Sequence, residues 1–346
     1  MSKIIVTGGL GYIGSHTAVD LLNDGFDVVI VDDLSNSQRD ILRRIETITG
    51  KNPEFLELDV SVRDNVMSML RRHSDAEAII HFAASKAVGE SVAKPLLYYR
   101  NNLNSMIFLL EGMLETGIAN IVFSSSCTVY GQPDKLPVTE STPFRPAESP
   151  YGNTKQICEE ILRDVCAVNK NIQSIALRYF NPVGAHDSCL IGELPRGVPN
   201  NLVPYITQTA AGILPELRIF GNDYDTPDGT PVRDYIHVVD LAIAHRMALR
   251  RLMERQQKSN YEYFNLGTGN GHTVLEVVKA FENAAGVQLR YRIVARRPGD
   301  VEKIWADTSL ANRELGWKAE RSLHDMMQSA WNWQLHLRDH PDLLEF

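Results

Sequence analysis

The chain of 346 residues has few of the features that mark secreted or metal-stabilised proteins. Its four cysteines, Cys127, Cys158, Cys166 and Cys189, form no CxxC pair, and no histidine lies at zinc-ligand spacing around them. We therefore expect a reducing compartment, no disulfide framework and no structural metal.

Long apolar runs and basic stripes are also missing. The opening "MSKIIVTGG" is too short an apolar run for a signal peptide, and no later stretch reaches the roughly 18 apolar residues of a membrane span. The formal charge is -8, with acidic and basic residues interspersed, so the charge pattern that binds phosphate backbones is absent. These absences predict a cytoplasmic protein without a membrane or nucleic-acid partner.

What the sequence does contain is an alternation of short apolar runs with amphipathic segments. Continuously apolar runs separated by helices indicate a parallel sheet covered on both faces. We predict an α/β fold with a doubly wound parallel sheet. The expected strands are residues 3–7, 27–33, 54–60, 78–84, 120–126 and 174–180, and the expected helices are 14–24, 61–73, 101–117 and 151–168.

The regular alternation breaks after residue 180. The stretches 185–201 and 221–231 are rich in Pro and Gly, while 233–252 and 261–267 regain a strand and helix pattern. We predict one domain over residues 1–180, to which the chain returns around 233–268, and a smaller mixed α/β lobe over 181–346.

A glycine-rich turn joins the first strand to the first helix. "VTGGLGYIGSH" places Gly9, Gly11 and Gly14 at GxGxxG spacing, and Gly8, Gly11 and Gly14 at GxxGxxG spacing. Glycines allow a tight turn and let backbone amides approach a pyrophosphate at the positive end of the following helix. This context predicts a dinucleotide site.

Two acidic residues follow at strand ends. Asp32 ends the second strand, where a carboxylate accepts hydrogen bonds from an adenosine ribose, and Asp59 ends the third strand, where it would meet the adenine or only cap a loop. No arginine stands among the neighbours "DDLSNS" to bind a 2'-phosphate, so the pattern favours NAD over NADP.

Tyr151 and Lys155 stand four positions apart, so they share one helix face. A tyrosine base near neutral pH needs its pKa lowered by about three units, or ~4 kcal/mol. One ammonium about 6 Å away supplies roughly 2.8 kcal/mol at an effective dielectric of ~20. The lysine alone falls short, and an oxidised nicotinamide would furnish the rest.

Three serines end the fifth strand in "FSSSCTVYG", where the carboxyl ends of parallel strands face the ligand crevice. At least one hydroxyl should face ligand, and we expect Ser124 and Ser125 to satisfy backbone groups instead. Together with YxxxK and TGGxGYIG, and with "LRYFNPVGAH", "PNNLVPY", "IFGNDYDTPDGTPVRDYIHVVDLA" and "RRPGD", this pattern resembles the UDP-galactose 4-epimerase family of the extended short-chain dehydrogenases/reductases.

The resemblance covers essentially the whole chain and implies a Rossmann-like cofactor domain. It assigns Tyr151 as the base that deprotonates the sugar 4-hydroxyl and Lys155 as the residue that lowers the tyrosine pKa and bonds the nicotinamide ribose. Ser126 would bridge the sugar hydroxyl and Tyr151. Hydride would pass from C4 to tightly bound NAD, the 4-keto sugar would turn over, and hydride would return to the opposite face.

The resemblance also implies two sets of binding residues. Two arginines in the second set suit a diphosphate, because a guanidinium donates paired hydrogen bonds to anionic oxygens; read without the resemblance, each would be a surface ion-pair partner. For NAD the set is Gly8, Gly11, Tyr12, Ile13, Gly14, Asp32, Asp33, Leu34, Ser35, Asn36, Ser37, Asp59, Val60, Phe82, Ala83, Lys86, Asn101, Tyr151, Lys155 and Phe180. For the UDP-sugar it is Ser126, Tyr151, Asn181, Asn201, Leu202, Phe220, Arg233, Arg297, Asp300 and Ile304.

Two positions bear on the exact reaction. Related 4,6-dehydratases carry an Asp-Glu pair after the serines, and decarboxylating relatives carry a glutamate there, whereas this chain has Cys127 and Thr128, which disfavours both reactions. Ile304 stands at a gate position where a tyrosine limits relatives to glucose and galactose. An isoleucine is smaller but stiff, so acceptance of N-acetylated UDP-sugars stays open.

Three alternatives accompany the epimerase hypothesis: interconversion of UDP-N-acetylglucosamine and UDP-N-acetylgalactosamine, net dehydrogenation, and a non-catalytic NAD-binding sensor. A sensor would not need the pair of Tyr151 and Lys155. By resemblance we also predict a homodimer formed through the helices at 101–117 and 151–168, although packing against the core explains their second apolar faces almost as well.

Overall fold

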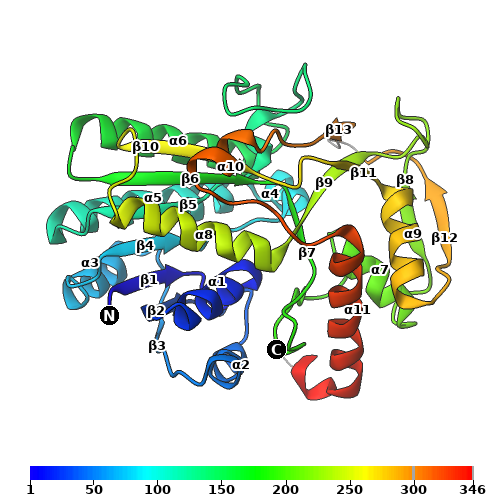
Figure 1. The fold of residues 1–346 in the computed structure, drawn as a ribbon, viewed down its shortest axis with the longest axis horizontal. Helices are drawn as coiled ribbons and strands as arrows, with labels where there is room; N and C mark the ends of the chain where they lie inside the picture. The colour runs from blue at the N-terminus through cyan, green and yellow to red at the C-terminus, as the bar shows by residue number, and fades with distance from the viewer. Residues whose placement is uncertain (298–300, 345–346) are drawn as a thin grey trace.

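In the computed structural model, which describes residues 1–297 and 301–344, the apolar runs form one parallel sheet (Figure 1). Its seven strands lie in the order β10-β6-β5-β4-β1-β2-β3, and every neighbouring pair is parallel. The order reverses between β1 and β4, which creates a crevice at the carboxyl ends of these strands. The strands are β1 (Lys3–Thr7), β2 (Asp27–Asp32), β3 (Glu54–Glu57), β4 (Ala78–His81), β5 (Asn120–Ser124), β6 (Gln173–Tyr179) and β10 (Tyr261–Leu266).

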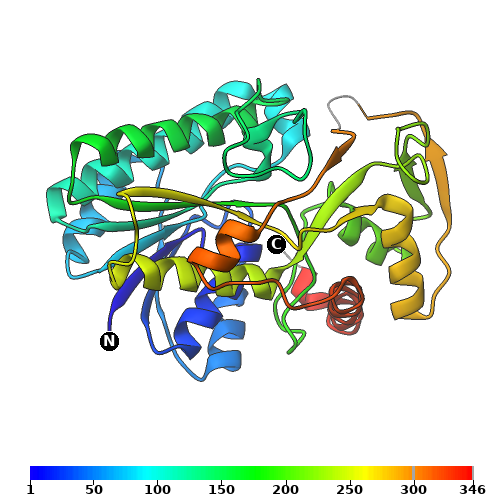
Figure 2. The same cartoon turned by 45° about the horizontal axis from the view of Figure 1, so that its top comes forward.

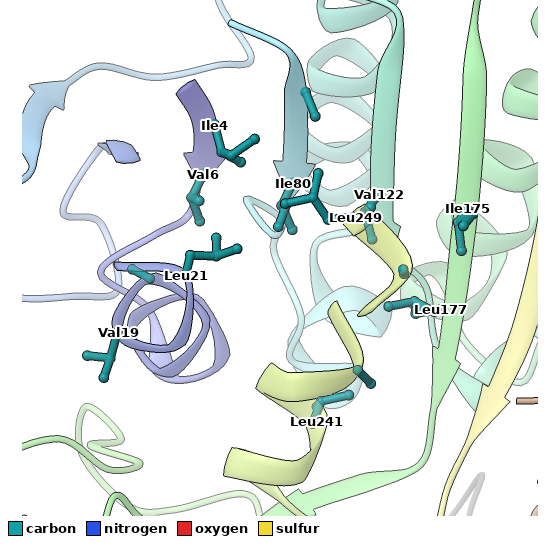
Figure 3. Packing of buried hydrophobic residues seen from close by; sticks show 14 of the residues in the cluster. Ile4, Val6, Val19, Leu21, Ile80, Val122, Ile175, Leu177, Leu241 and Leu249 are labelled. Atoms are coloured by element: carbon teal, nitrogen blue, oxygen red, sulfur yellow. The ribbon is translucent and has the colours of Figure 1, made fainter. Parts of the chain in front are cut away.

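Helices cover both faces of this sheet. Because side chains alternate along a strand, Ile4 and Val6 of β1 pack into one core and Ile5 into the other. Figure 3 shows the first core, with Leu21 of α1 and Leu241 of α8 facing the sheet. The covering helices are α1 (Tyr12–Asn23), α2 (Asp40–Thr49) and α8 (Val238–Met253) on this face, and α3 (Arg63–Arg72), α5 (Pro95–Thr116) and α6 (Pro150–Val168) on the other.

A smaller lobe carries the rest of the chain (Figure 2). In it β9 pairs in parallel with β7 and β13 and antiparallel with β11, and β8 pairs with β12. Its strands are β7 (Asn181–Val183), β8 (Leu217–Phe220), β9 (Val232–His237), β11 (Gly271–Thr273), β12 (Tyr291–Val294) and β13 (Lys303–Ile304), and its helices are α7 (Leu202–Ala210), α9 (Val274–Ala285) and α11 (Leu323–Asp339). The remaining short helices of the chain are α4 (Val88–Ala93), α10 (Ser309–Glu314), η1 (Cys127–Tyr130) and η2 (Pro341–Leu344).

The predicted doubly wound sheet with a smaller mixed lobe is confirmed, and several boundaries differ. The expected strands at 54–60, 78–84 and 120–126 end two or three residues early, at Glu57, His81 and Ser124, because their last residues turn into the crevice loops. The helix expected from 101 begins at Pro95, since proline suits a first turn, and α2 was not predicted.

The chain crosses between the two parts more than once. After β9 of the smaller lobe, α8 packs against α1 and β10 pairs with β6, so the chain returns to the large sheet over residues 238–266. The division at residue 180 stays a prediction. Within the described residues, no helix is long and apolar enough to cross a bilayer, and no three His, Cys, Asp or Glu residues gather as metal ligands.

Candidate active site

The glycine turn between β1 and α1 packs its backbone closely against neighbouring backbone. Gly8 has a φ of +68°, and a Cβ there would lie 2.7 Å from the Ala83 amide nitrogen. A Cβ at Gly14 would lie 2.1 Å from the Gly8 carbonyl oxygen. No side chain of the described residues caps the start of α1 at Gly11, so its first amides can point at an anion. The turn therefore fits a dinucleotide pyrophosphate.

Asp32 organises the loop that follows β2. Its Oδ1 accepts hydrogen bonds from the Leu34 amide (3.0 Å) and the Ser37 hydroxyl (2.6 Å), and its Oδ2 accepts one from the Leu10 amide (3.0 Å). Burial raises the pKa of this carboxyl, although the three hydrogen bonds oppose the shift. Asp32 thus ties the glycine turn to residues 34–37, where an adenosine ribose would bind.

The other predicted cofactor residues line the same edge of the sheet. Phe82 and Ala83 follow β4, and both amides donate to the Thr7 carbonyl. Asn101 on α5 donates to the Ser85 hydroxyl (3.1 Å). Asp59 caps its own loop by accepting from the Ser61 amide (2.7 Å), which is the structural role left open for it. The rest are placed by burial: Tyr12, Ile13 and Leu34 are half-buried, Asp33, Ser35, Asn36 and Lys86 are exposed, and Val60 and Phe180 are buried.

Tyr151 and Lys155 lie in the first two turns of α6. Ser149 caps this helix by accepting a hydrogen bond from the Gly152 amide (3.2 Å), and Pro150 takes the first helical position. This start turns both side chains to one buried face. The Lys155 ammonium lies 5.9 Å from the Tyr151 ring centre and donates to the Ser124 carbonyl (2.6 Å).

Burial dominates the electrostatics of this pair. It lowers the pKa of Lys155 to about 8, against the attraction of Cys158 and Glu159. It raises the pKa of Tyr151, and a hydrogen bond with Ser126 opposes the shift only in part. The estimate from the sequence counted the lysine's attraction and left out desolvation, so it understated how far the phenol must be stabilised as an anion.

The serine run ends β5 beside this pair, and the three hydroxyls diverge. Ser126 accepts from the Thr128 amide (3.2 Å), and its hydroxyl partly offsets the raised pKa of Tyr151. Ser124 bonds the Tyr179 hydroxyl and Ser125 donates to the Glu159 carboxylate. The expectation that Ser124 and Ser125 satisfy backbone groups is therefore wrong, because side chains of β6 and α6 lie within reach of them.

The predicted sugar-binding residues beyond Ser126 and Tyr151 are spread over several elements of the smaller lobe. Ile304 of β13 pairs with Arg233 of β9. Ile304 also belongs to a buried cluster with Phe180, and the partly buried Cys127 packs against this cluster. Asn201 precedes α7, which begins at Leu202, and donates to the Glu193 carboxylate (2.6 Å).

The remaining members of that set lie elsewhere. Asn181 begins β7. Arg297 lies over the Phe220 ring (5.7 Å to its centre), so these two residues contact each other. Asp300 lies outside the described residues.

Some residues of this region carried no sequence signal. Arg196 donates to the carbonyls of Leu34, Ser35 and Ser37, so an arginine does reach the Asp32 loop, from far along the chain. Glu159 forms a buried ion pair with Arg178 (2.6 Å) beneath the serines. From the sequence, Arg196 could only be placed in a Pro- and Gly-rich loop, and Glu159 could only be placed in a predicted helix. Neither position indicated these contacts.

Comparison with known proteins agrees with the geometry. The family model described as GDP-mannose 4,6 dehydratase matches residues 5–330. A UDP-glucose 4-epimerase of Bacillus subtilis is 52% identical over 331 residues, covering 96% of each chain. A UDP-glucose 4-epimerase from Stenotrophomonas maltophila, solved with NAD and formylated UDP-arabinopyranose, has a TM-score of 0.94 at 49% identity, covering 98% of this chain and 99% of that one. A Bifidobacterium longum UDP-glucose 4-epimerase in complex with NAD+ and UDP has a TM-score of 0.93 at 48% identity, covering 99% of each.

Proposed function

This chain belongs to the UDP-glucose 4-epimerase family of the extended short-chain dehydrogenases/reductases, and we infer that it is an NAD-dependent isomerase that interconverts UDP-galactose and UDP-glucose. The single observation that carries this inference is the placement of Tyr151 and Lys155 on one buried helix face, with the Lys155 ammonium 5.9 Å from the Tyr151 ring centre, at the carboxyl edge of the sheet that also holds the glycine turn.

The proton steps fall to Ser126 and Tyr151. Ser126 follows β5 beside the start of α6, and its hydroxyl partly offsets the raised pKa of Tyr151, so a proton from the sugar 4-hydroxyl would pass through Ser126 to the Tyr151 oxygen and return by the same route. Lys155 is cationic below its pKa of about 8 and therefore favours the phenolate. The chemistry that bound NAD would supply is reversible hydride transfer at C4, and its oxidised form would add positive charge that favours the Tyr151 phenolate.

The sugar must turn over while its nucleotide stays bound. We therefore expect the binding contacts to hold the diphosphate and the nucleobase, and few contacts to hold the sugar. Arg233 and Arg297 are the cations proposed for the diphosphate, and Asn201, Leu202 and Phe220 belong to the lobe that would hold the rest of the nucleotide. Dehydration stays disfavoured, because burial raises the pKa of the Cys127 thiol to about 12 and Thr128 is no stronger acid.

The test is proton NMR of UDP-galactose incubated with purified protein of measured NAD content. We expect UDP-glucose to accumulate to equilibrium without net NADH. Absence of UDP-glucose from protein that holds NAD would refute the assignment, and stoichiometric free NADH would favour the dehydrogenase alternative. A sensor would hold NAD and turn over neither substrate.

We propose a homodimer through α5 and α6. These helices pack side by side, and Leu96, Ile107 and Leu114 of α5 and Val168 of α6 are exposed apolar residues. Ile107 and Leu114 stand seven positions apart, two helical turns, so they share one side of α5. Such a stripe on two adjacent helices suits a second copy of the chain, since a twofold interface uses the same patch twice.

Light scattering should give twice the chain mass of 38.8 kDa. The double variant I107E/L114E should give the single mass, whereas I293E, at an apolar residue 44% exposed on β12, should leave the dimer intact. A monomeric wild-type protein would refute the proposal.

We also propose a cytoplasmic location, which the four free cysteines favour. Alkylation of unreduced protein should find four thiols.

A further inference from the structure

Residues 184–201, called the strap below, leave the smaller lobe and contact α1, α2 and the loop after β2. The strap begins with a tight turn in which Ala185 bridges Gly192, and it ends where α7 begins. It is attached to its own lobe by the Trp333 indole, which donates to the Glu193 carbonyl (2.9 Å), and by the Ser329 hydroxyl, which accepts from the Ala185 amide (3.2 Å).

The strap is also tied to three elements of the cofactor domain. The Tyr12 hydroxyl, at the start of α1, donates to the Gly184 carbonyl (2.7 Å). Arg44 of α2 donates to the Leu190 carbonyl (3.3 Å). The third tie is made by Arg196 itself, and it is the one that reaches the loop after β2.

Arg196 contacts that loop with both terminal nitrogens of its guanidinium group, Nη1 and Nη2. Nη1 donates to the Ser35 carbonyl (2.7 Å), and Nη2 donates to the carbonyls of Leu34 (3.1 Å) and Ser37 (3.0 Å). Asp32 holds the same loop from the inside, through the Leu34 amide and the Ser37 hydroxyl. The adenosine loop is therefore fixed on one side by a buried carboxylate and on the other by a charge that the smaller lobe supplies.

Packing behind the strap is incomplete. A cavity of about 300 Å³ separates part of it from α7 and α11, and its lining includes Leu194, Pro195, Thr207 and Trp333. Gly197, next to Arg196, has a φ of +70° and open space around its Cα. Because the strap rests partly on a hollow, its position depends on the polar ties more than on apolar contacts.

We propose that the strap closes the cofactor crevice and that Arg196 is the positioning residue that holds it closed, so that Arg196 sets how slowly NAD leaves the enzyme. This proposal rests on the NAD dependence inferred above. Release of the cofactor then requires the guanidinium to leave three carbonyls at once. A lysine keeps the charge but loses the forked donors, so it replaces the arginine only in part.

The strap also joins the two binding sites. The Glu193 carboxylate accepts from Asn201, which belongs to the proposed sugar set, and it feels the charge of Lys86 in the proposed cofactor set. A nucleotide-sugar that engages Asn201 thus acts on the same segment that covers NAD. We therefore expect UDP, used as a probe, to slow the release of NAD.

The experiment follows isotopically labelled NAD as it leaves the purified enzyme after dilution into unlabelled NAD. R196Q should release the label about tenfold faster than wild type, R196K should fall between them, and added UDP should slow release in wild type more than in R196Q. Activity that R196Q loses on dilution should return when excess NAD is added, which a purely structural defect would not allow. R39Q is the control, because Arg39 lies beside the same loop yet pairs with Glu57.

Equal release rates for wild type and R196Q would overturn the strap proposal. A wild-type enzyme that never retains labelled NAD would instead refute the proposed function, so the two failures are distinguishable. An R39Q enzyme that releases NAD as fast as R196Q would assign the effect to the general charge of the loop and also contradict the role of Arg196.

Discussion

At the scale of single residues, the chemistry depends on a phenol that burial holds protonated. Tyr151 is 9% exposed and its pKa is raised, while Lys155 is 4% exposed and its pKa is lowered to about 8. Each shift disfavours the charged form that catalysis uses, because low-dielectric surroundings penalise charge. The site is therefore poised to form the phenolate only when further positive charge is present.

Replacing Tyr151 with phenylalanine should abolish the base and leave the fold intact. We expect the Y151F variant to lose about 10²- to 10⁴-fold in kcat for UDP-galactose, the usual worth of a positioned base, while it retains NAD. Y291F, an exposed tyrosine on β12, is the matched control. Full activity in Y151F would show that another group takes the proton.

Ile304 decides how much room lies beside the sugar. It is 4% exposed and packs with Val129, Tyr130 and Phe180, so the proposed pocket wall is filled. In I304A we expect the ratio of kcat/KM for UDP-N-acetylglucosamine to that for UDP-glucose to rise about tenfold, at a stability cost of about 2–5 kcal/mol. V138A loosens the same cluster from another position and should leave the ratio unchanged. An unchanged ratio in I304A would place the specificity elsewhere.

At the scale of elements, the β1–α1 turn and the start of α6 carry the site. Both are local structures, since glycines fix the first and the Ser149 cap with Pro150 fixes the second. The first can be tested directly, because a Cβ at Gly14 would lie 2.1 Å from the Gly8 carbonyl oxygen.

G14A should fail to close the turn over a pyrophosphate. We expect its NAD content after gel filtration to fall by more than about tenfold, because the backbone must shift to relieve the contact. G89A is the control, since a Cβ at Gly89 would meet no atom within 4 Å. Stoichiometric NAD in correctly folded G14A protein would contradict the assignment of this turn.

At the scale of the whole molecule, buried neutral histidines make stability depend on pH. Burial lowers the pKa of His16 and His81 to about 3 and of His237 and His245 to about 4. Below about pH 6.5 the unfolded chain binds protons that the folded chain refuses, so stability falls as pH drops toward 4. Buried carboxyls with raised pKa, such as Asp32 and Asp234, bind protons in the folded state and offset part of this loss.

We expect the free energy of unfolding to fall between pH 7 and pH 5, with each such histidine contributing about 2 kcal/mol at pH 5. H245N isolates one of them, because an asparagine can still donate to the Leu241 carbonyl that His245 contacts at 2.9 Å. Denaturant unfolding at both pH values should show a loss about 2 kcal/mol smaller in H245N, and an unchanged loss in H324N at an exposed histidine. Equal losses in wild type and H245N would contradict the pKa assignment.

The molecule also shows where prediction from the sequence stops. The alternation of strands and helices, the glycine turn and the shared face of Tyr151 and Lys155 follow from short-range patterns. By contrast, helix α2 was not predicted, and the ends of β3, β4 and β5 were placed too late. Apolar residues continue past the ends of β3 and β4, and β5 runs directly into serines that carried the functional prediction. The sequence also gave no sign that Arg196 reaches the loop after Asp32 from the other lobe, where it donates to backbone carbonyls.

The sequence by itself determined the parallel α/β architecture, the dinucleotide turn and the likeness to the epimerases, because these depend on periodicity, glycine placement and local spacing. Only the tertiary structure decided that Tyr151 is buried near Ser126 and that Lys155 donates a hydrogen bond to the Ser124 carbonyl. It also decided that Arg196 contacts residues 34–37. Burial and contacts between distant segments arise from packing of the whole chain, and packing leaves no local mark in the order of residues.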